Sequence, residues 1–510
     1  MKNISELASL DVSGLTTLNT KVSDLISVDA ILSMPENSSV FLTVGTGGGK
    51  TYFATHNLYQ AAQELDLKIL IFENRINTIT QMDIEIKKNN CGDRITVIGY
   101  QAYEEGIKTH IERVNWDEYD IVVLDEYHHI NADAILPEAY YTYDIVLKVM
   151  QHTCRRFFMS ATPRGLDKHI QELHGNEVPY WELKIPMDYS KVYLQGFSSD
   201  IQLSSMICDV VDNKQKGIFF LDSSQKALDL HNTYVNSAYV CSVYNMNNPM
   251  SAADERLRDK VLAQQDCLPR QFMFTTTSMD VGVNLYDPKI TTVVSNIMDV
   301  EQSIQCLGRR RLNPGEMITF YLKNQPLDLI WRKYETLKKQ FEQCLFLDDF
   351  GQTAYFRHYP YSMDTEKHSV IDLYNEETDS LRRIPVMGRL LYARNYLKTL
   401  EEILESNDSY IGYVKKRFGF AEPVEEAKLP DFRRMLLDEN RGRIFFTAKD
   451  RSDFIKELKM VDKYGHAIRG TKSINDYLRR YNLPYCLEEL PRRQIDGKDY
   501  KYITVLKRSK

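Results

Sequence analysis

The sequence VGTGGGKT occupies residues 44–51, between an apolar run and a stretch with helical periodicity. Three consecutive glycines remove the Cβ atoms, so the backbone can curl tightly and turn several N–H groups toward one centre. The N-terminus of the following helix adds partial positive charge, which favours an anion. Lys50 adds a full charge for the outer phosphates of a nucleotide, and the Thr51 hydroxyl can ligate Mg²⁺. We therefore predict a triphosphate-binding turn made of Gly45, Thr46, Gly47, Gly48, Gly49, Lys50 and Thr51.

Short apolar runs alternate with helix-like stretches from about residue 40 to residue 300. The runs are continuous, as expected for strands that are buried on both faces of a parallel sheet. Residues 52–65 are one of the intervening stretches, with apolar residues near a 3.6-residue period. This alternation predicts an α/β doubly wound fold with right-handed crossovers. The apolar runs are residues 39–44, 67–72, 94–98, 119–124, 155–160, 217–221, 272–277 and 291–295.

The alternation is interrupted twice. Strand and helix patterning lapse in residues 174–190, which contain two prolines, so we expect a boundary between two α/β domains there. After about residue 325, residues 332–345 and 390–406 have helical periodicity. The expected domains are therefore 1–180, 181–327, a helical accessory region 328–440 and a basic module 441–510.

The second informative stretch is YDIVVLDEYHH, residues 119–129. An apolar strand that ends in two acids places their carboxylates at the carboxyl edge of a parallel sheet, where open α/β folds bind ligands. Asp125 is the candidate Mg²⁺ ligand, together with Thr51. Glu126 is the candidate base that orients and deprotonates a water, because phosphoryl transfer needs a metal, positive charge and a placed nucleophile.

GTGGGKT (45–51), DEYH (125–128) and FMSATP (158–163) together resemble the motifs of a superfamily 2 helicase or translocase. The phosphate-loop pattern of that family is A-x-x-G-x-G-K-T, with Val44 at the usual alanine position. The resemblance covers about residues 25–325. It implies two tandem RecA-like doubly wound parallel-sheet domains, with ATP and Mg²⁺ bound between them. A mostly helical region and a small basic α+β module would follow.

The resemblance also assigns residues outside the phosphate loop. Arg75 would contact a phosphate of the bound strand, and His128 would couple hydrolysis to nucleic acid. Ser160 and Thr162 belong to the motif that couples the state of the bound nucleotide to the binding of the nucleic-acid strand. FTTTSMDVGVNL (274–285) resembles motif V, which implies Thr277 as a nucleic-acid or coupling residue and Gly282 as a nucleotide-binding residue. Asn284 stands where aspartate is common.

EQSIQCLGRRR (301–311) resembles motif VI, Q-x-x-G-R-x-x-R. Gln305, Gly308 and Arg309 fit this pattern, but the arginine expected at position 312 is a leucine. Arg310 and Arg311 both precede that position, and either could be the arginine finger. We choose Arg311, since a planar guanidinium binds phosphate oxygens bidentately. The predicted catalytic residues are Glu126, Gln305, Arg309 and Arg311.

The composition limits the classes of function. The net charge is −7, but residues 441–510 hold 18 Lys/Arg against 9 Asp/Glu. A basic terminal module on an acidic body is consistent with a nucleic-acid binder. A winged-helix module and an α/β packing module are both open for these residues. No apolar run approaches the length of a membrane span, and the eight cysteines include no C-x-x-C pair. We expect an intracellular, cytoplasmic location and no membrane partner.

The sequence therefore predicts an ATP-dependent helicase that translocates on and unwinds nucleic acid, with DNA preferred over RNA. Two alternatives stay open. One is a duplex translocase or remodeller that does not separate strands, and the other is a degenerate nucleotide-binding scaffold with a nucleic-acid-binding tail. The first 59 residues contain no glutamine, so the adenine-reading glutamine of many relatives is missing. We expect partners in replication, restriction or defence, and a phage or mobile-element setting.

Overall fold

The structure is a computed structural model, and the chain divides into two compact units. One unit contains Met1–Ser198 and Val210–Glu422, and the other contains Ser199–Asp209 and Pro423–Lys510. Among the described helices, none is long and apolar enough to cross a membrane. The described residues are 4, 14–17, 19–135, 142–175, 177–234, 236–242, 245–263, 267–279, 284–313, 315–359, 370–375, 381–406, 408–420, 436–437, 439–445, 447–458, 460, 468–480, 485–495 and 498–507.

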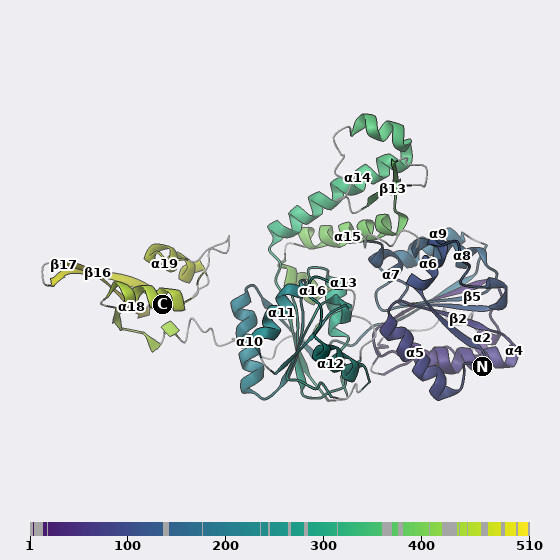
Figure 1. The fold of residues 1–510 in the computed structure, drawn as a ribbon, viewed down its shortest axis with the longest axis horizontal. Coiled ribbons are helices and arrows are strands. Elements are labelled where there is room, and N and C mark those ends of the chain that lie inside the picture. Colours follow the sequence, from purple (N-terminus) through teal and green to yellow (C-terminus); the bar gives the residue numbers. More distant parts are fainter. Residues whose placement is uncertain are drawn as a thin grey trace. The chain divides into compact units, whose positions relative to one another are not determined.

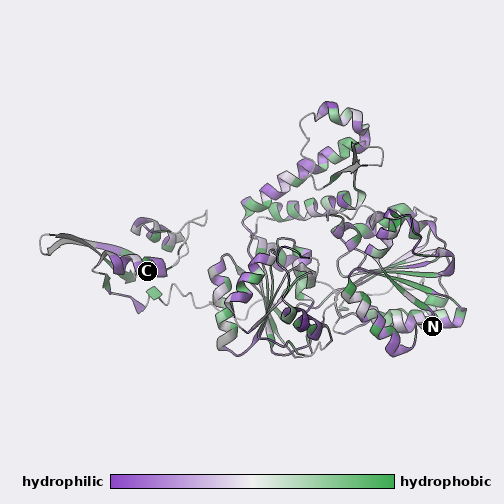
Figure 2. Ribbon diagram, in the orientation of Figure 1, coloured by the Kyte–Doolittle hydropathy of each residue, from purple (hydrophilic) through white to green (hydrophobic). Residues whose placement is uncertain are grey.

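The first lobe is built on a six-stranded sheet in the order β3-β2-β4-β5-β1-β6. Each strand pairs in parallel with its neighbours, so the carboxyl ends of all six meet at one edge. Figure 2 shows the central strands as hydrophobic ribbons, as expected for strands covered on both faces. The strands are β1 (Ser38–Val44), β2 (Ile69–Glu73), β3 (Ile95–Gly99), β4 (Ile121–Asp125), β5 (Arg155–Ser160) and β6 (Tyr180–Ile185).

Helices cover both faces of this sheet (Figure 1). Two separate hydrophobic cores lie against the two faces, one on the side of α2, α4 and α5 and the other on the side of α6, α7, α8 and α9. The helices of the first lobe are α1 (Val22–Leu25), α2 (Val28–Leu32), α3 (Lys50–Phe53), the π-helical turn η2 (Ala54–Leu58), α4 (Tyr59–Leu65), α5 (Ile76–Asn89), α6 (Tyr100–Lys108), η3 (Trp116–Glu118), α7 (His129–Ala132), η4 (Asp133–Ile135), α8 (Thr142–Gln151) and α9 (Leu166–His174).

Strand β6 corrects the predicted domain boundary. It lies within residues 174–190, where the sequence pattern suggests a break, and it pairs with β1 along its whole length. The first sheet therefore ends at Ile185, and the predicted boundary between residues 180 and 181 falls too early. As an edge strand, β6 alternates between exposed and buried side chains, so it has no continuous apolar run.

The second lobe repeats the architecture with a parallel sheet in the order β7-β12-β11-β8-β10-β9. Two tandem doubly wound parallel-sheet domains are thus confirmed. The elements from β7 to β12 are β7 (Val192–Phe197), α10 (Asp200–Asp212), β8 (Lys216–Phe220), α11 (Ser224–Thr233), β9 (Ser237–Val240), α12 (Ala252–Ala263), β10 (Phe272–Thr275), η5 (Thr277–Met279), β11 (Ile290–Ser295), α13 (Val300–Leu307) and β12 (Ile318–Lys323).

An accessory region follows the second lobe. Helix α14 (Leu327–His358) is interrupted at Gly351, whose φ is 74°, and α15 (Met387–Glu405) lies beside it (Figure 1). The predicted helical segments 332–345 and 390–406 correspond to these two helices. Between them lies an antiparallel strand pair that the sequence pattern does not predict. The remaining elements are β13 (Ile371–Asn375), β14 (Leu381–Pro385) and α16 (Tyr410–Phe418).

The basic module has a hydrophobic core of its own, drawn from residues 437–505. Its long strands β16 (Tyr485–Ile495) and β17 (Lys498–Lys507) form the antiparallel pair expected on either side of Asp496–Gly497, although this dipeptide lies outside the described residues. The winged-helix interpretation stays a prediction. The other elements are β15 (Ile444–Phe445), α18 (Ala448–Glu457) and α19 (Thr471–Arg480).

Candidate nucleotide site between the two lobes

The glycine-rich turn connects β1 to α3 at the carboxyl edge of the first sheet. Gly47 and Gly49 have φ values of 87° and 83°, a left-handed backbone that favours glycine. Gly45 and Gly48 are needed for a different reason, which is close packing. A Cβ on Gly45 would lie 2.7 Å from the backbone nitrogen of Met187. The turn is therefore shaped by glycine at four positions.

A segment near the start of the chain holds this turn from outside. Nζ of Lys21 donates to the carbonyl oxygens of Thr17 (2.6 Å) and Gly47 (2.7 Å), and the backbone N–H of Val22 donates to the carbonyl of Gly48 (3.0 Å). These bonds occupy carbonyls of the turn. The N–H groups of Gly45 and Gly48 are also engaged, since they donate to the carbonyls of Ile185 (2.9 Å) and Gly45 (3.1 Å), so a ligand is left to the other N–H groups of the turn. Burial and the nearby Arg311 lower the pKa of Lys21.

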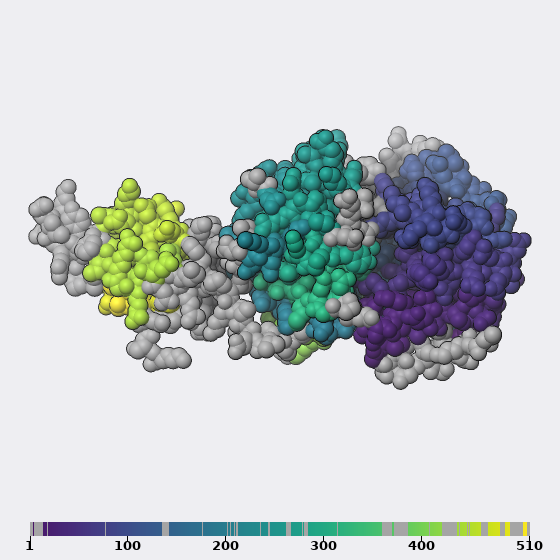
Figure 3. Space-filling model, turned by 90° about the horizontal axis from the view of Figure 1, so that it is seen from below, coloured from purple at the N-terminus to yellow at the C-terminus, as the bar shows by residue number. Residues whose placement is uncertain are grey.

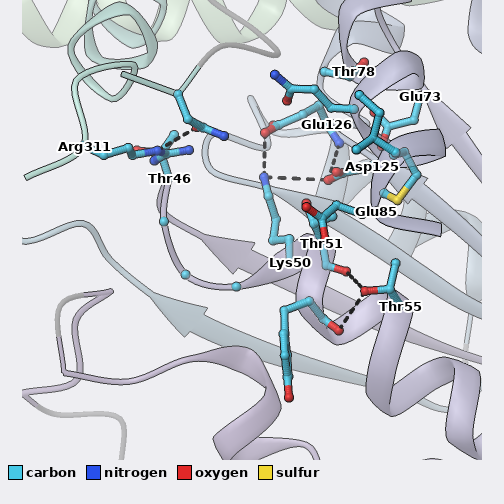
Figure 4. A pocket seen from close by; sticks show the side chains of 18 of the residues that line it. Thr46, Lys50, Thr51, Thr55, Glu73, Thr78, Glu85, Asp125, Glu126 and Arg311 are labelled. Atoms are coloured by element: carbon cyan, nitrogen blue, oxygen red, sulfur yellow. Dashed lines mark hydrogen bonds and ion pairs between the residues drawn. The ribbon is translucent and has the colours of Figure 1, made fainter. Parts of the chain in front are cut away.

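Lys50 lies against the two acids at the carboxyl end of β4, Asp125 and Glu126 (Figure 4). Its Nζ is 2.6 Å from Oε1 of Glu126 and 3.7 Å from Oδ1 of Asp125. The three side chains are about nine-tenths buried, so their charges interact through a medium of low polarity. The hydroxyl of Tyr100 donates to the backbone carbonyl of Asp125 (2.9 Å) and fixes the end of the strand.

Burial and the neighbouring charges shift the pKa values of these groups in opposite directions. Burial alone would lower the pKa of Lys50, but the two carboxylates raise it above its usual value. Burial raises the pKa of Asp125 to about 6, against the attraction of Lys50. Burial also disfavours the ionised form of Glu126, yet Lys50 and His128 hold its pKa well below its usual value. Glu126 therefore stays an anion, as a base must be.

The backbone of Glu126 is in an uncommon conformation. Its φ is 46°, in the left-handed region that a glutamate rarely adopts. Its N–H donates to Oδ1 of Asp125 at 2.9 Å, and this bond holds the turn. Conformations of this kind cost about 1–3 kcal/mol and cluster at functional sites.

The second lobe contributes arginines to the same site. A Cβ built on Gly47 would lie 3.6 Å from Nη1 of Arg311, so this guanidinium faces the glycine-rich turn. Nε of Arg311 donates to Oδ1 of Asn284 (2.7 Å), while its buried Nη1 has no hydrogen-bond partner among the described residues. Burial and then Arg309 lower the pKa of Arg311. A buried donor without a partner beside a phosphate-binding turn suits an anionic ligand.

Arg310 bonds to other residues of the second lobe instead. Its side chain is 1% exposed, Nε donates to the carbonyl of Ile290 (3.0 Å), and Nη2 pairs with Oε2 of Glu316 (2.6 Å). Arg309 lines the cavity and donates through Nε to the carbonyl of Gln305 (3.2 Å). Of the two candidates for the arginine finger, the geometry favours Arg311 over Arg310.

A cavity of about 900 Å³ contains these groups. It is lined from the first lobe by the glycine-rich turn, by α3, η2 and α5, and by the acids, and from the second lobe by the arginines and their neighbours. Gln305 is not among the lining residues, although we expected it to be catalytic. The lining residues are Thr46, Gly47, Gly48, Gly49, Lys50, Thr51, Tyr52, Thr55, His56, Glu73, Thr78, Gln81, Met82, Ile84, Glu85, Asp125, Glu126, Cys267, Asn284, Tyr286, Arg309 and Arg311.

Gln305 instead joins a hydrogen-bond network that links the second lobe to the first. Figure 3 shows the surfaces of these two lobes next to each other. Nε2 of Gln305 donates to Nε2 of His128 (2.7 Å) and to Oγ1 of Thr162 (2.6 Å). Nδ1 of His128 lies 2.8 Å from Oγ of Ser160, which also accepts the N–H of Thr162 (3.0 Å). Burial lowers the pKa of His128 to about 3, so the ring is neutral. With Nε2 accepting, the single ring proton lies on Nδ1 and is donated to Ser160.

The family model described as "Type III restriction enzyme, res subunit" (ResIII) matches residues 16–165. This range contains the glycine-rich turn, the two acids after β4 and the segment around Ser160. The second parallel sheet then returns Arg309 and Arg311 to the same cavity. The match identifies residues 16–165 as a domain of this family, which supports the interpretation of the chain as a superfamily 2 helicase, an enzyme of the class of nucleic-acid-dependent ATPases.

The chain is similar to solved structures of three proteins. Dbp5 of S. cerevisiae bound to RNA and ADP BeF3 has a TM-score of 0.46 at 12% identity, covering 64% of this chain and 90% of Dbp5. Mss116p bound to ssRNA and AMP-PNP has a TM-score of 0.43 at 12% identity, with 71% and 84% covered. A DEAD box protein from Methanococcus jannaschii has a TM-score of 0.34 at 15% identity, with 61% and 87% covered. Among curated proteins, none matches the helicase chain.

Two further predicted residues, Arg75 and Thr277, lie outside the cavity lining. Arg75 precedes α5, and its Nη2 pairs with Oδ1 of Asp133 at 2.9 Å. A strand phosphate would have to share this guanidinium with Asp133. Thr277 begins η5 after β10, at the carboxyl edge of the second sheet. Gly282 lies outside the described residues, so its predicted role stays a prediction.

Sequence reasoning missed several residues of the helicase site. Lys21 and Thr17 carry no motif, and only the folded chain brings them to the glycine-rich turn. Asn284 was noted as a departure from aspartate, but its bond to Arg311 was not foreseen. Glu73 ends β2 beside β4, and burial followed by Asp125 raises its pKa well above the usual value. Its place at the carboxyl end of a strand was the available signal.

The donor groups fit the magnesium ion implied by the helicase family. Thr51 and Asp125 line one cavity and offer a hydroxyl and a carboxylate oxygen, the hard ligands that Mg²⁺ prefers. Within the described residues no cluster of three or more His, Cys, Asp or Glu side chains could hold a metal alone. Mg²⁺ at a nucleotide site needs only one or two protein ligands, because phosphates and water supply the others.

Proposed function

We propose that this helicase-family chain binds ATP·Mg²⁺ in the cavity between its lobes and uses hydrolysis to translocate on and unwind DNA. The observation that carries the proposal is the placement of Arg311. Its Nη1 faces Gly47 of the phosphate-binding turn from the second lobe, in one cavity with Lys50 and Glu126. Hydrolysis then requires both lobes, so that binding and release of nucleotide can move one lobe relative to the other.

In this proposal, different residues bind the phosphates, hold the metal ion, accept the proton and stabilise the developing charge. Nζ of Lys50 and the backbone N–H groups of the glycine-rich turn other than those of Gly45 and Gly48 bind the phosphates. Thr51 and Asp125 would hold Mg²⁺, which would neutralise the developing charge. Lys50 exchanges its contact with Glu126 for phosphate oxygens. Glu126 is then free to accept the proton of the attacking water, and Arg311 stabilises the charge that develops on the transferred group.

The network around His128 supports a coupling role for Ser160, Thr162 and Gln305. It joins the carboxyl edge of the first lobe to α13 of the second, and it meets the cavity lining at Glu126, whose Oε2 lies 3.4 Å from Nδ1 of His128. A shift of either lobe must break or remake these buried bonds, which is costly in a medium of low polarity. Gln305 is therefore proposed as a coupling residue, in place of the direct catalytic role we expected.

DNA is favoured by the description of the matching family, since a restriction enzyme acts on DNA. The same description favours the second candidate, a duplex translocase that does not separate strands. It also favours restriction or defence as the setting over replication. The basic module 441–510 is proposed to add nucleic-acid affinity, since it holds 18 Lys/Arg against 9 Asp/Glu.

One experiment tests the ATPase proposal and its substrate. The ATPase rate of the full chain is measured with single- and double-stranded DNA and RNA at fixed salt. We expect stimulation by DNA that exceeds stimulation by RNA. Equal rates with and without every nucleic acid would contradict the motor function. A labelled forked duplex then separates the candidates, because a helicase releases a strand whereas a translocase only displaces a bound block.

A further inference from the structure

Arg164 follows the segment FMSATP (158–163) and has an uncommon backbone. Its φ is 54°, a left-handed conformation that an arginine rarely adopts, and Gly165 beside it has a φ of 73°. Such conformations persist only where the surroundings fix them, and they occur at functional sites. The question is what fixes the backbone of Arg164.

The side chain of Arg164 extends from the first lobe to two carboxylates of the second. Nη1 lies 2.7 Å from Oδ2 of Asp299, and Nε lies 3.5 Å from Oε2 of Glu301. The guanidinium is 4% exposed and the two carboxylates are 13% and 12% exposed. Burial opposes ionisation of the guanidinium, but the two acids raise its pKa above its usual value. Loss of Arg164 would leave two buried acids without their common partner, which is a costly arrangement.

These two acids control the start of α13. Asp299 is the N-cap, and its Oδ1 accepts the N–H of Gln302 (3.1 Å). Helix α13 then carries Gln305 and ends just before Gly308, after which Arg309 and Arg311 enter the nucleotide cavity. A helix of this kind is stiff, so a tilt at its N-terminus displaces the residues at its other end.

The accessory helices complete the same cluster. The guanidinium carbon of Arg164 lies 5.6 Å from the ring centre of Tyr392 on α15, whose hydroxyl donates to Oδ2 of Asp299 (3.2 Å). Nη2 of Arg417 on α16 lies 3.0 Å from Oε1 of Glu301. Two guanidiniums thus face two carboxylates, and the cluster joins the first lobe, the second lobe and the accessory region.

We propose that Arg164 is a positioning residue for hydrolysis: it anchors the start of α13 to the first lobe, and thereby aligns Arg311 with the phosphate-binding turn. The proposal rests on the proposed ATPase function. Arg164 does not line the nucleotide cavity, so its effect on the reaction acts through α13. The accessory helices α15 and α16 contribute to this alignment through Tyr392 and Arg417.

The first test compares Arg164→Lys and Arg164→Gln with Arg156→Lys. Arg156 is a matched control, because it is buried to a similar degree and its Nε bonds the carbonyl of Val149 within the first lobe. We expect kcat to fall about 10- to 100-fold in both Arg164 variants, the size of loss expected for a misplaced catalytic group. KM for ATP should stay within about twofold, because ground-state binding does not use the finger.

A second measurement distinguishes misalignment of Arg311 from a smaller amount of folded protein. The ratio of affinities for ADP–aluminium fluoride and for ADP should fall in the Arg164 variants, because only the transition-state analogue needs an aligned Arg311. Lower stability alone would leave this ratio unchanged. An unchanged ratio together with unchanged kcat would overturn the proposal.

The second test does not depend on hydrolysis. Spin labels are placed at Leu65→Cys and Met317→Cys, which are exposed positions in the first and second lobes, with the native cysteines that are not buried, Cys208, Cys267 and Cys486, replaced by serine. The distribution of interlobe distances should broaden in Arg164→Gln and stay unchanged in Arg156→Lys. If the parent protein proves to lack nucleic-acid-stimulated ATPase, the proposed function fails, yet this broadening would still establish the anchoring. Equal distributions in all three proteins would contradict it.

Discussion

Nε2 of Gln305 lies 2.7 Å from Nε2 of His128, and this bond joins the second lobe to the second residue after Glu126 in the first. The same amide reaches Oγ1 of Thr162 at 2.6 Å. Both NH₂ protons of Gln305 are therefore used between the lobes, and none is directed at the nucleotide cavity. The proposed coupling role of Gln305 can therefore be tested by removing this amide.

Gln305→Ala should reduce stimulation by nucleic acid more than it reduces basal hydrolysis. The substitution removes both bonds between the lobes while leaving Arg311 and Glu126 in place. We expect the fold-stimulation of kcat to drop about tenfold, within the usual range of coupling energies. The measurement is ATPase rate with and without saturating DNA. Gln325→Ala is the control, because Gln325 is a buried amide that bonds Asn296 within the second lobe. Equal losses of basal and stimulated rates would contradict the coupling role.

Glu126→Gln should keep ATP binding and stop turnover. The amide cannot accept the proton of the attacking water, so kcat should fall by about 10²–10⁴-fold, the typical contribution of a general base. Lys50 also loses its buried anionic partner at 2.6 Å, which should leave it freer to bind phosphate. Nucleotide affinity is measured by fluorescence with a labelled ATP, and turnover by phosphate release. The exposed Glu118→Gln serves as control. Near-full turnover in Glu126→Gln would refute the assignment.

Substitution of Arg311 should lower the rate of hydrolysis, whereas substitution of Arg310 should lower the stability of the protein. Arg311→Ala should lower kcat about 10³-fold or more, as expected for an arginine finger, with little loss of stability. Arg310→Ala removes one partner of a buried ion pair with Glu316, so it should lower the free energy of unfolding by about 3–5 kcal/mol. Urea unfolding and single-turnover hydrolysis are measured on both variants. The opposite pattern would identify Arg310 as the finger.

The buried His128 should make the protein sensitive to acid. Its pKa is about 3 in the folded chain, lowered by burial and by His129 and Arg164 against the attraction of Glu126, and its usual value is 6.5. Below pH 6.5 the unfolded chain binds a proton that the folded chain does not, so stability is fully present above pH 6.5 and is lost as pH falls toward 3. The slope is about 1.4 kcal/mol per pH unit. Urea unfolding of His128→Gln between pH 4 and 6 should have a shallower slope, and an identical slope would contradict this origin.

The fold was predictable where burial leaves a simple pattern. The central strands read as continuous apolar runs because both faces of each sheet are covered, and all eight predicted runs overlap strands of the structure. Four strands of the two sheets, β6, β7, β9 and β12, were missed. Side chains of β6, β7 and β12 alternate between buried and more exposed positions, and residues such as Glu182 and Gln195 break the apolar run. Strand β9 is buried but only four residues long.

The site was predictable only where its chemistry is local in sequence. The glycine-rich turn and the acids after β4 each lie in one short stretch, so residue type and spacing identify them. Arg310 and Arg311 are chemically identical neighbours, and only the packing of Arg310 on Glu316 distinguishes them. Lys21 and Arg164 have partners that are distant in the chain, so no local pattern indicates them.

Gly308→Ala should test the close contact between Gly308 of the second lobe and Thr46 of the first. A Cβ at this position would lie 2.5 Å from Oγ1 and 2.9 Å from Cγ2 of Thr46, which belongs to the phosphate-binding turn of the other lobe. Since such contacts cannot be accommodated without a shift, the turn and Arg311 should separate. We expect kcat to fall about 100-fold, with urea unfolding almost unchanged. Thr46→Gly in the same chain removes the opposing side chain, so the double variant should recover part of the lost rate. Gly470→Ala is the control, because the atom nearest to a Cβ there is Oγ of Ser473 at 3.8 Å, an ordinary contact distance. A double variant no faster than Gly308→Ala would show that the two lobes do not approach each other at this point during hydrolysis.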